Sequence, residues 1–198
     1  MLLIRDGMRV GLGTGTTVSH LLPLLPGHAQ GVTYFASSPG TERAAVELGL
    51  DVQQFERMDR LDLTIDGADQ VALDGWLVKG GGGAHTREKI LAAAAERFVV
   101  IVSEDKLVER LHPPVPVELL RFGLAATLRA LAPVEVRDAP PSPDGGVIAD
   151  YQGSTDDPGR LAIRLASTPG VVEYGLFEPE LVQEILVARS SGVEAIRL

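Results

Sequence analysis

The run Phe98-Val99-Val100-Ile101-Val102 constrains the fold most strongly, because no polar residue interrupts it. Such a run is typical of a strand buried on both faces of a parallel sheet. Shorter strand patterns precede it over residues 8–12, 32–36 and 61–65. The predicted helices between these strands cover residues 18–25, 42–48 and 87–96. This alternation predicts an α/β fold with an open, mainly parallel, doubly wound sheet.

The order of the predicted strands and helices changes after residue 114. Residues 117–174 contain a strand–helix–strand–strand–helix–strand order, which resembles a smaller ferredoxin-like α+β insert. The chain is then predicted to return to the first domain through a helix over 179–188 and a strand over 193–196. The predicted domains are therefore 1–114 with 178–198, the main α/β catalytic domain, and 115–177, the smaller one.

Composition excludes several classes of function. Net charge is −9, which argues against a nucleic-acid or anionic-membrane surface. Cysteine is absent, so disulfides and thiolate chemistry are excluded, and the four histidines form no close metal-ligand pair. No apolar run approaches the roughly 20 residues of a membrane span. The segment before the first strand is too short for a signal peptide, and we expect a soluble, cytoplasmic protein.

The glycine run Gly80–Gly83 indicates a ligand site. Glycines carry no side chain to pack in a core, but they let peptide N–H groups approach a ligand closely. Lys79 precedes the run, and Glu88 follows it in the first turn of a helix that Thr86 would cap. This combination favours a cradle for an anionic, oxygen-rich substrate with an acid–base residue. The alternatives are a flexible surface loop and a glutamate that merely complements the helix dipole.

Two further segments lie where strands are predicted to end. Gly11–Thr17 joins a strand to a helix, a geometry that presents N–H groups to phosphate, although an ordinary βα turn would look similar. Neither a dinucleotide fingerprint nor a P-loop motif is present there. Asp66 and Asp69 follow the strand at 61–65, and Lys106 follows the apolar run. In open α/β sheets ligands bind beyond the carboxyl ends of strands, but aspartates also commonly close turns.

Several separated segments together resemble the ribose-5-phosphate isomerase A family. They are Gly11–Thr17, Thr64–Asp69, Lys79–Ala84, Arg87–Ile90, Lys106, Gly170–Val172, Gly175–Phe177 and Gly192–Val193. The resemblance covers nearly the whole chain in the right order, so the set is more specific than any one motif.

The resemblance implies reversible conversion of ribose 5-phosphate to ribulose 5-phosphate in the pentose phosphate pathway, without metal or organic cofactor. Glu88 would move a proton between C1 and C2 through an enediolate, Asp66 and Asp69 would serve ring opening and hydroxyl proton transfer, and Lys79 would steady the oxyanion. The implied substrate-binding residues are Thr14, Gly15, Thr16, Thr17, Asp66, Gly67, Ala68, Asp69, Lys79, Gly80, Gly81, Gly82 and Lys106. We also expect a homo-oligomer, in the first place a dimer.

The chain departs from the family pattern at several places, of which Pro23 and the proline-rich segment 139–143 are two. Gln70 stands where the family usually has Glu, and only residues 1–7 precede the first strand, where relatives usually have a helix. The alternative function is a catalytically weakened sugar-phosphate-binding or regulatory protein on the same scaffold. The joint presence of Asp66, Asp69, Lys79 and Glu88 favours the enzyme.

Overall fold

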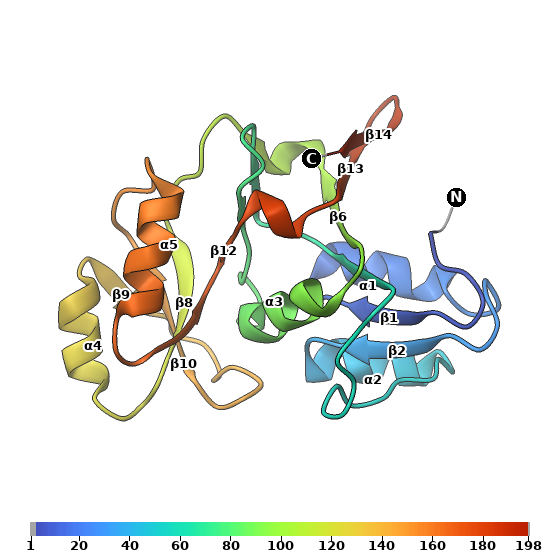
Figure 1. The fold of residues 1–198 in the computed structure, drawn as a ribbon, viewed down its shortest axis with the longest axis horizontal. Helices are drawn as coiled ribbons and strands as arrows, with labels where there is room; N and C mark the ends of the chain where they lie inside the picture. The colour runs from blue at the N-terminus through green and yellow to red at the C-terminus, as the bar shows by residue number, and fades with distance from the viewer. Residues whose placement is uncertain (1–2, 198) are drawn as a thin grey trace. The chain divides into compact units, whose positions relative to one another are not determined.

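The apolar run at 98–102 lies inside a mainly parallel sheet, as predicted. The computed structural model describes residues 3–197 and divides them into two units (Figure 1). Unit 1 consists of the described parts of Met1–Gly67, Arg87–Glu104 and Glu180–Leu198, and unit 2 of Ala68–Thr86 and Asp105–Pro179.

This division differs from the predicted domains, 1–114 with 178–198 and 115–177. Residues 68–86 and 105–114 belong to unit 2 and not to the unit with the parallel sheet. Residues 1, 2 and 198, which the predicted domains include, lie outside the described chain.

The sheet of unit 1 has the open, mainly parallel arrangement that the sequence predicts. Its strands, in spatial order, are β14 (Gly192–Arg197), β13 (Glu184–Arg189), β6 (Phe98–Ser103), β3 (Leu63–Asp66), β1 (Arg9–Leu12) and β2 (Thr33–Ala36). All neighbours pair in parallel except β13 and β14, which are antiparallel. The carboxyl ends of β1, β2 and β3 therefore lie on the same side of the sheet.

Helices cover both faces of this sheet. The helices are α1 (Thr16–Leu21), α2 (Pro39–Glu47) and α3 (His85–Ala94). Successive residues of a strand point to opposite faces. Tyr34 accordingly packs in a cluster with Val18 of α1 and Ala45 of α2, whereas Phe35 packs in another with Leu91 of α3. The sheet is thus doubly wound.

The helix boundaries follow local chemistry. Pro23 lacks an N–H donor, and α1 gives way to a short 3-10 helix at Leu22–Leu24. Ser38 caps α2, because its side chain accepts a hydrogen bond from the Thr41 N–H. The prediction that Thr86 caps α3 is wrong: the helix begins at His85, and Thr86 lies within it.

The predicted helix over residues 179–188 is also wrong. Only Pro179–Leu181 forms a 3-10 turn, and Glu184–Arg189 is strand β13. Leu181, Ile185 and Ala188 have helical spacing, but the segment instead pairs with β6 on one side and β14 on the other. Hydrogen bonds from two neighbouring strands outweigh a weak local preference.

Unit 2 contains the predicted ferredoxin-like sheet. Its strands, in spatial order, are β11 (Val171–Tyr174), β8 (Val115–Leu119), β10 (Val147–Tyr151) and β9 (Val134–Val136). All pairs are antiparallel, and the connections include helices α4 (Leu124–Leu131) and α5 (Pro158–Ser167). Leu131 of α4 and Leu165 of α5 are fully buried in the cluster that also contains Val117 of β8.

A second sheet in unit 2 carries the glycine run. Its strands are β12 (Leu176–Phe177), β5 (Leu77–Val78), β4 (Gln70–Ala72) and β7 (Leu107–Val108). Lys79 follows β5 directly, and Lys106 immediately precedes β7. None of the helices within residues 3–197 combines the length and the apolar character needed to cross a bilayer.

Candidate active site

In unit 1, Asp66 lies at the end of β3 against the loop that follows β1. Its side chain is 1% exposed. Its Oδ1 accepts hydrogen bonds from the N–H groups of Gly67 at 2.7 Å and Thr14 at 3.2 Å. A Cβ on Gly13 would lie only 1.8 Å from the carboxyl carbon, so glycine is required at that position. The loop therefore packs closely against the Asp66 carboxylate and donates a hydrogen bond to it.

The hydroxyl groups of Thr14, Ser38 and Thr41 stabilise the same loop. The hydroxyls of Thr14 and Ser38 lie 3.0 Å apart, and the Ser38 hydroxyl donates to that of Thr41. Thr41 in turn donates to the Gly13 carbonyl at 2.9 Å. The role of Thr41 cannot be read from the sequence, because it depends on contact with a loop 28 residues earlier.

The remaining predicted residues of this loop lie near the surface. Gly15 and Thr16 are exposed, and Gly15 has φ +100°, a conformation that favours glycine. Thr17 is half-buried, and its Cβ would lie 3.8 Å from a Cβ on Gly67. These groups are open to a small ligand.

Glu88 lies in the first turn of α3 and is 3% exposed. A carboxylate in the first turn of a helix interacts favourably with the positive end of the helix dipole. Unit 1 therefore contains two buried carboxylates among the predicted site residues, Asp66 and Glu88. Buried ionisable side chains of this kind are more typical of functional sites than of ordinary surfaces.

In unit 2, Asp69 contacts the glycine run directly. Its backbone N–H donates to the Val78 carbonyl, and its Oδ2 accepts a hydrogen bond from the Gly81 N–H, each at 2.8 Å. A Cβ on Gly81 would lie 2.7 Å from Oδ1 of the same carboxylate. Gly80 has φ +102°, and a Cβ there would lie 2.6 Å from the buried His85 ring. At Gly80 and Gly81 the absence of a side chain is thus a steric requirement.

Lys79 places a buried ammonium group at the start of the run. Its side chain is 3% exposed, and Nζ lies 5.3 Å from the centre of the Phe177 ring, a favourable cation–π distance. Its backbone N–H donates to the Gly175 carbonyl at 2.8 Å. In such surroundings a positive charge interacts more strongly with an anion than it would in water.

The other predicted residues of unit 2 are more exposed. Ala68 is half-buried, and Gly82 is exposed beside Gly81. Lys106 lies in a 3-10 turn, Glu104–Lys106, and its ammonium is 3.3 Å from the carboxylate of Asp105. An exposed lysine of this kind can reach a phosphate from solution at little cost in desolvation.

Gln70 makes two hydrogen bonds to the backbone of His112, which explain why an amide stands at this position. The side chain accepts a hydrogen bond from the His112 N–H at 2.9 Å and donates to the His112 carbonyl at 2.8 Å. An ionised glutamate has no donor and could make only the first of these bonds. The departure from the family pattern therefore matches a specific partner in this chain.

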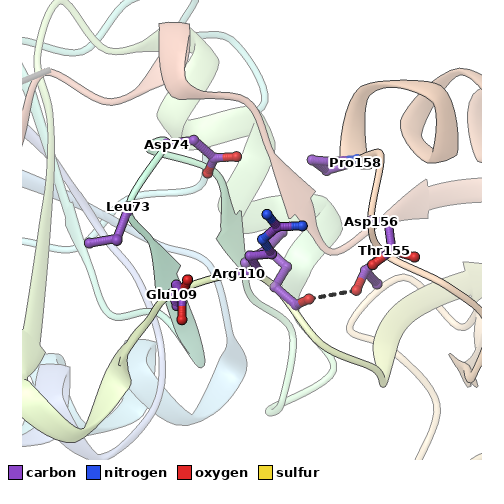
Figure 2. Close-up of a pocket in the computed structure, with 8 residues that line it drawn as sticks. Leu73, Asp74, Glu109, Arg110, Thr155, Asp156 and Pro158 are labelled. Carbon is purple, nitrogen blue, oxygen red and sulfur yellow. Dashed lines mark hydrogen bonds between the residues drawn. The ribbon is translucent and has the colours of Figure 1, made fainter.

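An open pocket elsewhere in unit 2 does not suit a sugar phosphate. It has a volume of about 380 Å³ and is shown in Figure 2. Its lining includes the carboxylates of Asp74, Glu109 and Asp156 against the single guanidinium of Arg110. Excess negative charge repels a phosphate dianion. None of the predicted site residues lines this pocket.

Known proteins resemble the chain over nearly its full length. The family model for ribose 5-phosphate isomerase A (phosphoriboisomerase A) matches residues 33–192. Ribose-5-phosphate isomerase A from Rhodopseudomonas palustris (strain BisB18) is 43% identical over 213 residues, which cover 98% of this chain and 91% of the relative.

Solved structures agree with the sequence matches. Ribose 5-phosphate isomerase A from Methanocaldococcus jannaschii has a TM-score of 0.92 and 31% identity, with 99% of this chain and 93% of that chain covered. A D-ribose-5-phosphate isomerase in complex with phospho-erythronic acid has the same TM-score, identity and coverage. This chain belongs to the ribose 5-phosphate isomerase A family.

Proposed function

We propose that this chain interconverts D-ribose 5-phosphate and D-ribulose 5-phosphate through an enediolate. The observation that carries the proposal is that Glu88 is buried and follows the buried Lys79 by nine residues in the sequence, with the glycine run between them. A protein that only bound a sugar phosphate would have little need for a buried base. Membership in the isomerase family supports the same reaction.

Glu88 is the proposed base for the carbon-bound proton. In the open-chain aldose it removes the proton from C2, and the released electron pair forms a C1–C2 double bond while charge moves to the carbonyl oxygen O1. The protonated carboxyl group then returns the proton to C1. O1 gains a proton and the C2 hydroxyl loses one, so the aldose becomes a ketose with no net gain or loss of atoms.

Lys79 and the glycine N–H groups are the proposed stabilisers of the enediolate. The negative charge develops on oxygen, and fixed donors at that oxygen lower the barrier more than mobile water does. Asp66 and Asp69 are assigned to ring opening and to proton transfer at the hydroxyls. Each carboxylate accepts backbone N–H bonds, which hold it in one orientation.

The proposed substrate-binding groups divide between the two units. Unit 1 carries Thr14–Thr17, with Asp66 and Gly67, and unit 2 carries Ala68, Asp69, Lys79–Gly82 and Lys106. Hydroxyl and N–H donors of the first group suit phosphate oxygens, and Lys106 adds a positive charge to a protein whose net charge is −9.

The proposal is tested by a coupled assay of ribose 5-phosphate isomerisation that compares the wild type with Glu88→Gln. The amide cannot accept the C2 proton, so kcat should fall by about 100- to 10,000-fold. The matched control is Glu96→Gln, which removes one carboxylate from an exposed position just after α3 and should leave kcat unchanged. Binding of phospho-erythronic acid by Glu88→Gln checks that the site is still formed. An inactive wild type, or full activity of Glu88→Gln, would contradict the proposal.

We further propose that the protein acts as a homodimer in the cytoplasm, in the non-oxidative branch of the pentose phosphate pathway. Ribose 5-phosphate and ribulose 5-phosphate are intermediates of that branch. The family membership and the 45% apolar composition support this assignment.

A further inference from the structure

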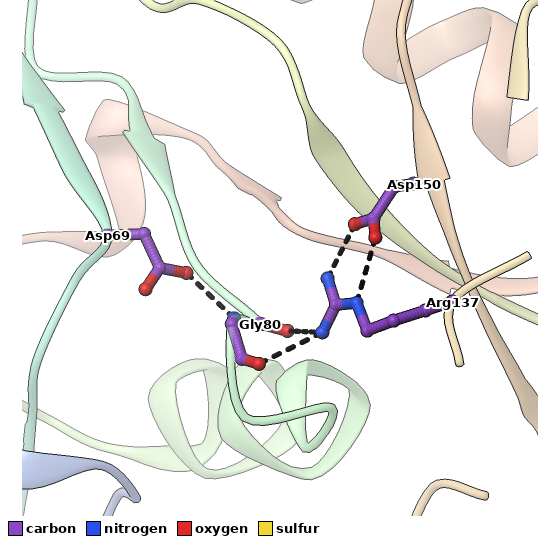
Figure 3. Close-up of polar contacts among 5 residues, drawn as sticks. Asp69, Gly80, Arg137 and Asp150 are labelled. Carbon is purple, nitrogen blue, oxygen red and sulfur yellow. Dashed lines mark hydrogen bonds and ion pairs between the residues drawn. The ribbon is translucent and has the colours of Figure 1, made fainter. Parts of the chain in front are cut away.

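A guanidinium group from the ferredoxin-like sheet holds the peptide groups of the glycine run (Figure 3). Arg137 follows β9, and its Nη1 donates to the carbonyl oxygens of Gly80 at 3.1 Å and Gly81 at 2.9 Å. Asp150 of β10 receives the other side of the guanidinium: Nε donates to one carboxylate oxygen at 2.8 Å and Nη2 to the other.

The guanidinium is itself fixed in place. The backbone N–H of Arg137 donates to the Ile148 carbonyl at 3.0 Å, beside the pairing of β9 with β10. The side chains of Arg137 and Asp150 are 21% and 17% exposed, so their paired hydrogen bonds are partly shielded from water. A bidentate arginine–carboxylate pair defines the direction of the remaining N–H groups. Arg137 can therefore act as a rigid donor to the glycine run.

These contacts set the direction of two peptide planes. In a trans peptide the C=O and the next N–H point in opposite directions. The plane between Gly80 and Gly81 is held at both edges, because its C=O meets Arg137 and its N–H meets Asp69 at 2.8 Å. The plane between Gly81 and Gly82 has its C=O on Arg137, which turns the Gly82 N–H to the opposite side.

A run of glycines needs such an external restraint. Glycine populates positive and negative φ about equally, so a peptide plane between two glycines can turn over at little cost. A flipped plane would present a carbonyl oxygen where an N–H is required, which repels an oxyanion. Arg137 and Asp69 together bind the C=O and N–H edges of this segment and disfavour the flip.

We propose that Arg137, oriented by Asp150, is a positioning residue of the isomerisation: it fixes the Gly80–Gly82 peptide planes so that the Gly81 N–H stays on Asp69 and the Gly82 N–H faces the developing oxyanion. The inference rests on the proposed role of the glycine run. It adds Arg137, which follows β9 and lies 56 positions after Gly81 in the sequence, to the residues that act in the reaction.

The test compares Arg137→Ala and Arg137→Lys with the matched control Arg164→Ala. Arg164 also donates to main-chain carbonyls in unit 2, those of Ala130 to Ala132 at 3.1–3.4 Å, but it is not bonded to the glycine run. Misplaced catalytic groups can cost about 100-fold, so kcat of Arg137→Ala should fall by about 10- to 100-fold while KM changes by less than about threefold. Arg137→Lys should lie between alanine and wild type, because an ammonium cannot form the same fork. Arg164→Ala should lower stability without lowering kcat.

Two further readouts separate positioning from general loss of structure. Millimolar guanidinium should partly restore kcat of Arg137→Ala and should not raise that of Arg164→Ala. Amide hydrogen exchange at Gly81 should accelerate in Arg137→Ala but not in Arg164→Ala, and this measurement needs no turnover. If Arg137→Ala keeps kcat within twofold of wild type, or Gly81 exchange is unchanged, the positioning role is refuted. An inactive wild type would instead refute the proposed function, while the exchange data would still report on the restraint.

Discussion

Gly13→Ala should displace the Asp66 carboxylate, because the new methyl group would occupy the same space. The added Cβ would lie 1.8 Å from both Cγ and Oδ1 of Asp66. Non-bonded carbon atoms approach to about 3.5 Å, so the carboxylate must move by about 1.7 Å or the backbone must shift. Asp66 is 1% exposed and has no open solvent to move into.

The cost follows from the hydrogen bonds that such a movement would break. Oδ1 accepts from the N–H groups of Gly67 and Thr14. A hydrogen bond to a charged group contributes about 1.5–3 kcal/mol, so loss of both costs about 3–6 kcal/mol. A domain of ordinary stability, about 5–15 kcal/mol, would be seriously weakened. Because Asp66 is a proposed catalytic residue, kcat should also fall.

Urea unfolding followed by circular dichroism measures the stability change, with Gly40→Ala as the control. Gly40 lies in α2, and a Cβ there would meet only the Ser38 hydroxyl at an ordinary 3.8 Å. That substitution should be neutral or stabilise by up to about 1 kcal/mol. A double-mutant cycle sharpens the test: in an Asp66→Ala background the cost of Gly13→Ala should shrink by about 2 kcal/mol. If Gly13→Ala costs less than about 1 kcal/mol and retains activity, the reasoning is refuted.

Two other predictions concern stability. Gln70→Glu should lower the free energy of unfolding by about 1–3 kcal/mol, because a carboxylate cannot donate to the His112 carbonyl. Gln70→Met, which loses both hydrogen bonds to His112, is the comparison in urea unfolding. An unchanged midpoint for Gln70→Glu would contradict the assigned contact. Burial, followed by the nearby carboxylates, raises the pKa of Tyr174 from its ordinary value of 10.0 to about 12. The unfolded chain then loses this proton at lower pH than the folded one, so stability should fall as pH rises from about 10 to 12. Tyr174→Phe should reduce that fall, and identical pH profiles for the two proteins would count against it.

Local sequence was sufficient for most of the fold. The apolar run at 98–102 is the centre of a parallel sheet, and the strand–helix order of residues 115–174 forms the ferredoxin-like sheet. These patterns report which residues can be buried on one face or on both, and burial dominates the folding free energy. The helix prediction for the segment 184–189 is wrong because its apolar spacing suits a helix, whereas the hydrogen-bonding partners in β6 that make it a strand lie far away in the sequence.

For the candidate site, too, part could be predicted from the sequence and part became visible only in the structure. Glycines, aspartates and lysines at the ends of strands identified the stretches around Asp66, Lys79 and Glu88, because the sequence itself shows where side chains are missing or charged. The tertiary structure alone revealed that Asp66 fills the space beside Gly13 and that Arg137 holds the glycine run. Such contacts join residues more than 50 positions apart. The sequence by itself determined which groups this protein has for its chemistry, whereas only the fold decided what holds them, because hydrogen bonds and steric exclusion act over a few ångströms of space and not along the chain.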